Sequence, residues 1–221
     1  MNHLLEPPDS ETSPLTIAVN DLSKRFNREW IFRELSLEFA AGLTYAITGP
    51  NGSGKSTLLQ VVWGQVPQTS GTIIYKKGAL DVPLEQAFRY VSIAAPYMDL
   101  IDEFTLMEML NFHFKLKKIR SGFSIGQLLQ IMYLENAADK QLVNFSSGMR
   151  QRLKLGLALY TEADAYFLDE PGTNLDRRAF GWYIDELSKL PKRSIVFIAS
   201  NEPEEYPQDA VILNLTDYKK K

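Results

Sequence analysis

One stretch of the sequence, residues 49–57, limits the possible folds and functions more than any other. It reads Gly-Pro-Asn-Gly-Ser-Gly-Lys-Ser-Thr and meets every position of the phosphate-binding pattern G-x-x-x-x-G-K-[ST]. Its glycines permit backbone conformations with positive φ that bring N–H groups against phosphate oxygens. The apolar residues 43–48 suit a buried parallel strand, and residues 56–62 suit a helix. Strand, glycine-rich loop and helix together predict a site for a nucleoside triphosphate.

Several residues of this stretch have an expected contact with the triphosphate. Lys55 can reach the β and γ phosphates, and the hydroxyl of Ser56 lies where Mg²⁺ is expected. The helix that begins near Gly54 directs the positive end of its dipole at the anion. The predicted nucleotide-binding residues of the stretch are Gly49, Asn51, Gly52, Ser53, Gly54, Lys55, Ser56 and Thr57.

Length and composition exclude several other functions. The 221 residues suit one large domain or one domain with lobes, and a net charge of −3 gives no sign of a nucleic-acid partner. Cysteine is absent, which excludes disulfides, thiolate metal sites and cysteine nucleophiles. Of the two histidines, His3 lies in the polar start, and His113 is predicted to pack or face solvent rather than bind metal. No apolar stretch approaches 18 residues, so a cytoplasmic protein is expected.

Two carboxylates end an apolar run later in the chain. Residues 165–168 suit a central parallel strand, and Asp169 and Glu170 follow it directly. Beside a phosphate loop, Asp169 can hold Mg²⁺ through its water shell, while Glu170 can orient or deprotonate the attacking water. Without that loop the pair is an ordinary strand end. Together the two features favour a metal-binding Asp169 and a catalytic Glu170.

A third segment lies between these two, at residues 145–152. Its small residues Ser146, Ser147 and Gly148 open a predicted helix and expose N–H groups that form an anion site. This site cannot reach the nucleotide of its own chain but can cap the nucleotide of a second chain. The alternative is a serine N-cap on an amphipathic helix.

The order of these segments resembles that of the nucleotide-binding subunit of ABC-type ATPases, across roughly residues 15–216. Residues 49–57 are similar to the family's Walker A motif, and residues 169–171 to the end of its Walker B motif. The family signature, usually Leu-Ser-Gly-Gly-Gln followed by a basic residue, Gln and Arg, is similar to residues 145–152, where the agreeing positions are Ser146, Gly148, Gln151 and Arg152. Residues 174–176 resemble the D-loop, which implies that Asp176 lies at a dimer contact.

The resemblance implies an α/β fold of the P-loop NTPase type. A RecA-like parallel sheet core, an antiparallel β lobe and an inserted α-helical lobe at roughly residues 97–150 are expected. Residues 1–14 are expected to form a flexible lead, followed by an ABC-type ATP-binding domain over residues 15–221. Residues 15–19 and 35–39 are predicted strands of the antiparallel lobe, and residues 72–75, 90–93 and 195–199 are further predicted strands.

The resemblance also implies ligands and partners. ATP and Mg²⁺ are the expected cofactors, held between two copies of the chain or between it and a paired ATPase subunit. Each nucleotide is expected to lie between one protomer's phosphate loop and the partner's signature. A separate integral-membrane permease is the expected partner for transport, and it places the chain at the inner face of the cell membrane. Two other functions stay open: a soluble ABC-type ATPase of assembly or remodelling, and a nucleotide-gated binding module with little turnover.

The adenine contact and the permease contact each have two interpretations. Phe26 resembles the aromatic residue on which the family stacks adenine, but a packed strand-end aromatic is the alternative, and Trp30 is a second candidate for stacking. Residues 97–101 with Phe104 form either a permease-docking surface or part of the core of the helical lobe.

Two positions depart from the family pattern. Ala95 occupies the place of a glutamine that links the γ-phosphate to the helical lobe. Asn201 occupies the place of the switch histidine; its amide can donate a hydrogen bond to the γ-phosphate but cannot carry a positive charge. We therefore predict that Asn201 and Glu170 are the catalytic residues and that ATP hydrolysis is slow.

Overall fold

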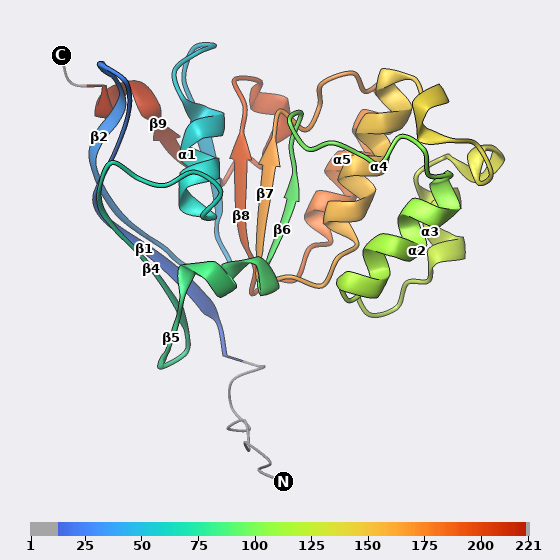
Figure 1. Ribbon diagram of the computed structural model, residues 1–221, viewed down its shortest axis with the longest axis horizontal. Coiled ribbons are helices and arrows are strands. Elements are labelled where there is room, and N and C mark those ends of the chain that lie inside the picture. Colours follow the sequence, from blue (N-terminus) through green and yellow to red (C-terminus); the bar gives the residue numbers. More distant parts are fainter. Residues whose placement is uncertain (1–12, 220–221) are drawn as a thin grey trace, which may run out of the picture.

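The computed structural model describes residues 13–219 of the chain. Residues 1–12 of the predicted lead, including His3, lie outside the described residues. Within the described range the chain forms two sheets and five α-helices, besides short 3₁₀ helices (Figure 1). The antiparallel sheet has the order β2-β1-β4-β5, and the parallel sheet has the order β6-β7-β8-β3-β9.

The bounds of the elements follow chain order. The strands are β1 (Leu15–Phe26), β2 (Glu29–Phe39), β3 (Thr44–Thr48), β4 (Ser70–Lys77), β5 (Leu80–Val82), β6 (Val91–Ala94), β7 (Ala165–Asp169), β8 (Ile195–Ala199) and β9 (Val211–Asn214). The helices are α1 (Lys55–Val62), α2 (Leu106–Leu116), α3 (Ile125–Ile131), α4 (Ser147–Leu159) and α5 (Arg177–Ser188).

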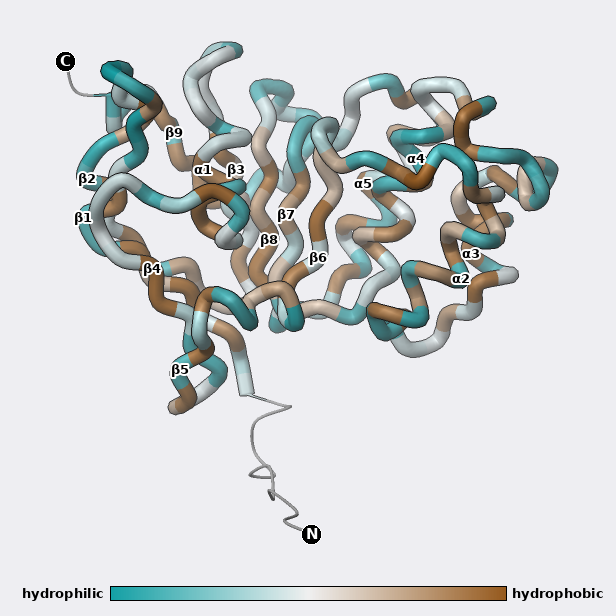
Figure 2. The backbone as a smooth tube through the Cα atoms, viewed as in Figure 1, coloured by the Kyte–Doolittle hydropathy of each residue, from teal (hydrophilic) through white to brown (hydrophobic). Residues whose placement is uncertain are grey.

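The parallel sheet is the middle layer, and both of its faces are buried. Every residue of β7 and β8 is buried. Because successive side chains of a strand point to opposite faces, Phe167 packs with α1 and the antiparallel sheet, whereas Tyr166 and Leu168 pack with α4 and α5. Two-sided burial explains the continuously apolar sequence of these strands. Figure 2 shows hydrophobic residues gathered in β6, β7 and β8 at the centre.

The helical lobe stands at the end of the molecule remote from the antiparallel sheet (Figure 1). Thr105 begins α2 with a capping box, in which its hydroxyl accepts from the N–H of Glu108 at 3.2 Å. Ser124 begins α3, and its N–H donates to Oε1 of Gln127 at 2.9 Å. His113 lies half-buried in α2, with its Nε2 2.8 Å from the hydroxyl oxygen of Thr161. This position gives His113 a packing role.

The arrangement confirms the predicted α/β fold with its parallel core, antiparallel lobe and inserted helices. Two details differ from the expectation. β1 and β2 are longer than the predicted strands. Register shifts and a positive φ of 49° at Asp21 interrupt the alternating pattern, so the sequence did not indicate their full length. The short strands β5 and β9, which pair with β4 and β3, have no counterpart among the predicted strands.

Candidate nucleotide-binding site

Three neighbouring strands of the parallel sheet bring the predicted site residues to one edge. β7, β8 and β3 lie next to one another in the sheet, and all three run in the same direction. Asp169 ends β7, Asn201 follows β8, and Gly49 follows β3. The carboxyl edge of the sheet therefore collects residues that are far apart in the sequence, as expected for a ligand site in an open α/β sheet.

The phosphate loop connects β3 to α1 in a conformation that needs its glycines. Gly49, Gly52 and Gly54 have φ values of 141°, 77° and 104°. A Cβ on Gly54 would lie 2.1 Å from Cγ2 of Ile31, so the antiparallel sheet also closes against the loop. A Cβ on Gly52 would meet nothing within 4 Å, and this residue is exposed. The loop is thus supported on one side and open on the other.

Two polar side chains of the loop are buried. Lys55 is 6% exposed, and its Nζ donates to the carbonyl oxygen of Gly49 at 2.8 Å. The hydroxyl of Ser53 is also buried and has no hydrogen-bond partner among the described residues. Because the Lys55 ammonium is held against the loop backbone, it can bind phosphate oxygens without a large movement of its side chain.

Asp169 is a buried carboxylate at this edge of the sheet. It is 1% exposed, and neither carboxylate oxygen has a well-formed hydrogen bond among residues 13–219. Burial raises the pKa of this carboxyl to about 6, against the opposing effects of the Ser56 hydroxyl and the Lys55 ammonium. Buried carboxylates are normally paired or bind metal. Asp169 and Ser56 fit Mg²⁺, which binds through one or two carboxylates together with phosphate oxygens and water.

Glu170 adopts a conformation that is unusual for its residue type. Its φ is 46°, a value at which side chains with a Cβ are strained, and such strain is concentrated at functional sites. Gln151 of α4 holds the adjacent backbone, because its Nε2 donates to the carbonyl oxygen of Pro171 at 2.9 Å. The carboxylate is partly exposed and adjacent to Asp169, where a base for water is expected.

Asn201 contacts the phosphate loop directly. Its Oδ1 accepts from the N–H of Gly49 at 3.1 Å, and its Nδ2 donates to Oδ1 of Asn51 at 3.4 Å. The structure therefore brings Asn201 to the predicted site. A side chain with one donor and one acceptor makes both contacts without carrying charge.

The signature residues lie on the other side of the parallel sheet. Ser146 caps α4 by accepting from the N–H of Met149 at 3.2 Å, and α4 packs on the face opposite α1. Asp176 caps α5 in the same way, accepting from the N–H of Ala179 at 2.8 Å. Both residues thus have a capping role within the chain, and Ser146 and Ser147 are also exposed.

The two adenine-stacking candidates lie on one hairpin, at the ends of β1 and β2. Phe26 is 46% exposed, which shows that it is not a packed core residue, and Nζ of Lys24 lies 4.5 Å from its ring centroid. The guanidinium groups of Arg25 and Arg33 lie 5.1 and 4.7 Å from the ring centroid of Trp30. Phe26 stays the predicted stacking residue.

Residues 97–101 with Phe104, which follow β6, were predicted to be either a permease-docking surface or part of the core of the helical lobe, and the structure divides them between a packed and an exposed group. Leu100, Ile101 and Phe104 pack against the core of the helical lobe, whereas Met98 is 37% exposed. Tyr97 is half-buried; burial raises the pKa of its hydroxyl, and the negative charge of Asp169 acts in the same direction.

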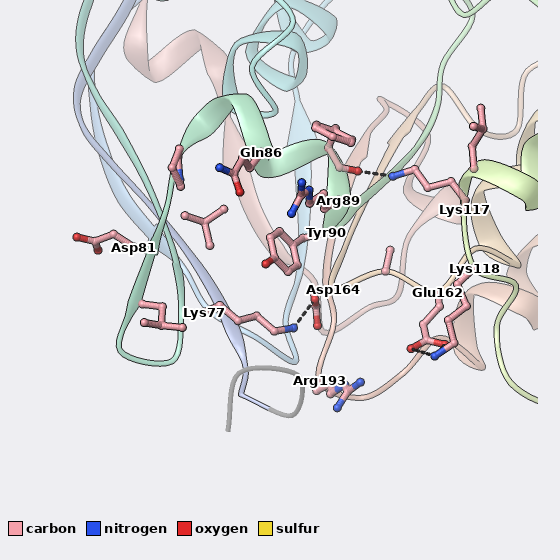
Figure 3. Close-up of a pocket in the computed structure, with 16 residues that line it drawn as sticks. Lys77, Asp81, Gln86, Arg89, Tyr90, Lys117, Lys118, Glu162, Asp164 and Arg193 are labelled. Atoms are coloured by element: carbon pink, nitrogen blue, oxygen red, sulfur yellow. Dashed lines mark hydrogen bonds and ion pairs between the residues drawn. The ribbon is translucent and has the colours of Figure 1, made fainter. Parts of the chain in front are cut away.

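A cavity of about 740 Å³ lies elsewhere (Figure 3). It is at the amino end of the parallel strands, between β5 and the end of α2. Four of its eight charged side chains pair with one another: Lys77 with Asp164 at 2.5 Å, and Lys118 with Glu162 at 3.1 Å. None of the predicted nucleotide-binding residues lines it.

Comparisons with known proteins agree with the geometry at the carboxyl edge. A family model described as "ABC transporter" matches residues 32–173. The chain belongs to the ABC transporter family. It is 29% identical to the uncharacterized ABC transporter ATP-binding protein YybJ of Bacillus subtilis over 191 residues, 86% of each chain. It is 31% identical to the Nod factor export ATP-binding protein I of Burkholderia lata, covering 86% of this chain and 64% of that one.

Solved structures share the fold of this family member. A putative ABC transporter ATP-binding protein from Pyrococcus furiosus has a TM-score of 0.75 at 22% identity, covering 93% of this chain and all of that chain. A bacterial Atm1-family ABC exporter solved with ATP bound also gives 0.75, at 19% identity, covering 97% of this chain and 39% of that one. The family match and the named relatives confirm the predicted family of ATP-binding subunits. ATP hydrolysis is general to this family. Within residues 13–219, no helix is both long and apolar enough to cross a membrane.

Proposed function

We propose that this ABC family member binds ATP and Mg²⁺ at its phosphate loop and hydrolyses ATP slowly. The supporting observation is the buried carboxylate of Asp169, which has no well-formed hydrogen bond next to Ser56 and Lys55. Mg²⁺ would be held by Ser56 and Asp169, and Glu170 would orient or deprotonate water. When bound, Mg²⁺ supplies charge neutralisation at the phosphates.

The second part of the proposal is a dimer with two nucleotides between its protomers. The signature and the phosphate loop of one chain lie on opposite faces of the parallel sheet. One chain would therefore use its phosphate loop for one nucleotide and offer Ser146, Ser147 and Gly148 to the nucleotide of its partner, with Asp176 at the contact. The exposure of both serines supports this arrangement.

The third part is the partner in transport. A dimer that closes on ATP and opens after hydrolysis would drive a separate integral-membrane permease, which would hold the chain peripherally at the inner face of the membrane. Met98 and Asp99 are exposed after β6 and would belong to the docking surface.

A nucleotide-gated binding module is the second candidate function. Asn201 favours it, because this neutral side chain is already engaged by Gly49 and Asn51. In this alternative ATP closes the dimer but is hardly consumed. Steady-state phosphate release distinguishes the two candidates.

A Glu170→Gln variant tests the proposed site. The amide keeps the shape of the side chain and removes the charge that activates water, so turnover should fall about 10²- to 10⁴-fold while ATP still binds. Size-exclusion chromatography with ATP and Mg²⁺ should then show a dimer. The matched control is Lys55→Ala in the same background, which should remain monomeric. A Glu170→Gln protein that binds ATP at saturation and stays monomeric would contradict the two-site dimer.

A further inference from the structure

The peptide group between Pro171 and Gly172 is held by two side chains from different parts of the chain. Its carbonyl oxygen accepts from Nε2 of Gln151, on α4, at 2.9 Å. Its N–H donates to Oε1 of Glu205, which follows β8, at 3.1 Å. Both polar atoms of this peptide group therefore have a side-chain partner. The group cannot rotate without breaking at least one of these hydrogen bonds.

Glu205 approaches this peptide group so closely that no side chain fits at position 172. A Cβ on Gly172 would lie 2.2 Å from Oε1 of Glu205 and 3.0 Å from Cε2 of Phe180. The φ of Gly172 lies outside the left-handed region, so the need for glycine comes from this contact and not from the backbone conformation. A larger residue would displace the carboxyl group from the N–H.

Glu205 is itself fixed by its own backbone contacts. It ends the short 3₁₀ helix Pro203–Glu205 and is 6% exposed. Its carbonyl oxygen accepts from the hydroxyl of Tyr183, a buried residue of α5, at 2.7 Å. Its N–H donates to the carbonyl oxygen of Glu202 at 3.0 Å. The side chain therefore reaches Gly172 from a backbone that is held on both sides.

The second carboxyl oxygen of Glu205 makes no comparable contact. Oε2 is buried and has no well-formed hydrogen bond among residues 13–219. A buried polar atom without a partner lowers stability. An apolar side chain would avoid this loss but would leave the N–H of Gly172 without the acceptor that it has here. The carboxyl group is therefore better explained by its contact with Gly172 than by stability.

The same peptide group is the centre of a turn that begins at Glu170. The carbonyl oxygen of Glu170 accepts from the N–H of Thr173 at 3.2 Å, which closes a β-turn over residues 170–173. The φ of Glu170 is 46°, and a residue in this region persists only where its surroundings hold it. Rotation of the central peptide group would change the turn type and with it the direction of the Glu170 side chain.

We propose that Glu205 is a positioning residue for Glu170. By holding the N–H at the centre of the turn 170–173, Glu205 keeps the Glu170 carboxylate in the orientation needed to activate water. The proposal rests on the proposed function and adds a residue that the sequence motifs do not include. The hydrogen bonds of Glu205 go to Gly172 and Tyr183 and not to the phosphate loop, so its loss should affect hydrolysis and not ATP binding.

Three variants of the full chain separate the acceptor from the bulk of the side chain. Glu205→Met removes both oxygens from a side chain of similar length, whereas Glu205→Gln keeps one acceptor. Glu204→Met, at the exposed neighbouring position of the same short helix, is the matched control. Glu205→Met should lower kcat about 10- to 100-fold, the range for a small misplacement of a catalytic group, with little change in KM for ATP. Glu205→Gln and Glu204→Met should keep nearly the kcat of the parent.

Hydrogen exchange of the nucleotide-free protein gives a readout that does not depend on turnover. Exchange in a peptide covering residues 170–176 should be about 2- to 10-fold faster in Glu205→Met, the range for one hydrogen bond, and close to the parent in Glu205→Gln. Exchange in residues 195–199 of β8 should not change. Gly172→Ala reaches the same contact from the other side, because its Cβ displaces the carboxyl group, and should act like Glu205→Met.

A combination with Glu170→Gln tests whether the effect passes through Glu170. In that background Glu205→Met should not lower the residual turnover further, because the carboxylate that it positions is already absent. A further fall by the same factor would overturn the proposal.

Several other results would also overturn it. These are an unchanged kcat and unchanged exchange in Glu205→Met, an equal loss of kcat in Glu205→Met and Glu205→Gln, or a loss that lies in KM. If Glu205→Met does not fold, Gly172→Ala decides by the same measurements. A parent whose turnover does not exceed that of Lys55→Ala would instead overturn the proposed function, and the exchange of residues 170–176 would still test whether Glu205 holds the turn.

Discussion

The two edges of the parallel sheet differ in whether their buried charged groups have partners within the described chain. At the carboxyl edge, the oxygens of Asp169 and the hydroxyl of Ser53 are buried and have no well-formed hydrogen bond among the described residues. At the amino edge, Lys77 and Asp164 are also buried but form an ion pair of 2.5 Å, and Lys118 pairs with Glu162 (Figure 3). One edge leaves polar atoms to be satisfied by a ligand, and the other satisfies them within the chain.

This difference separates a cavity from a functional site. The large cavity lies at the edge where charges pair internally, and the phosphate loop lies at the edge where they do not. Strain follows the same division, because Glu170 has a φ of 46° at the carboxyl edge. Groups that lower stability collect where binding is expected. Cavity volume alone would have placed the functional site at the amino edge.

The strongest test of this comparison is to break the ion pair at the amino edge. Lys77→Met leaves Asp164 as an uncompensated buried charge, which should cost about 3–5 kcal/mol of unfolding free energy. Replacing both residues, as Lys77→Met with Asp164→Leu, should recover most of the loss. Denaturant unfolding measures both effects, and calorimetry should show unchanged ATP affinity in any variant that stays folded. A large loss of ATP affinity would show that the two edges are not independent.

A smaller effect of opposite sign is expected at the carboxyl edge. Asp169→Asn removes a poorly satisfied buried charge and should stabilise the nucleotide-free protein by on the order of 1–3 kcal/mol at pH 7. The pKa of Asp169 is raised by burial to about 6, so the stability linked to its protonation is present below about pH 4 and lost as pH rises through 6. The gain of the variant should therefore be small at pH 4 and reach its full value above pH 6.

Thermal or denaturant unfolding between pH 4 and 7 checks this result, and Asp185→Asn on the exposed face of α5 is a suitable control. Addition of ATP and Mg²⁺ should stabilise the parent more than Asp169→Asn. A variant that is less stable than the parent at pH 7 without nucleotide would show that the carboxylate has partners inside the chain.

The smallest expected effect concerns Asn201. Asn201→His should raise steady-state turnover about 5- to 30-fold, since an imidazole can take up positive charge near the γ-phosphate and gain 1–2 kcal/mol in the transition state. A neutral ring nitrogen can still accept from the N–H of Gly49, so the loop contact need not be lost. Phosphate release should be compared in the parent, Asn201→His, and Asn201→His with Ala95→Gln. Equal or slower release in Asn201→His would mean that the amide is not a weaker substitute for the histidine.

The sequence predicted those parts of the site whose chemistry is local. Glycines at fixed spacing followed by Lys55 and Ser56 can be recognised without knowing the rest of the chain. Asp169 was found because an apolar strand ended beside it. Contacts between distant segments were not predictable in this way: Tyr97 was placed in an apolar surface, and Lys154 was not singled out. Lys154 donates to the backbone carbonyl oxygens of Ala95 and Pro96, and contacts of this kind leave no pattern in the sequence.

The same reasoning explains the errors in the fold. The long strands β1 and β2 are interrupted by register shifts, so their periodicity fades where their pairing continues. β9 has four residues, too few for an alternating pattern to be distinguished from a loop, and only its pairing with β3 defines it. β7 and β8 are buried on both faces, so their continuously apolar sequences could be recognised as strands. β9 is mostly exposed, and its sequence could not.

The close approach of Gly54 to Ile31 has a consequence for how this protein can change over generations. Any side chain at position 54 meets a methyl group 23 residues earlier in the chain, as well as an unfavourable φ of 104°. A smaller residue at position 31 would relieve the collision but not the backbone strain. Single substitutions at position 54 are therefore blocked for two separate reasons, and no one compensating change elsewhere can restore them. The antiparallel lobe therefore restricts the substitutions that the phosphate loop can accept at position 54.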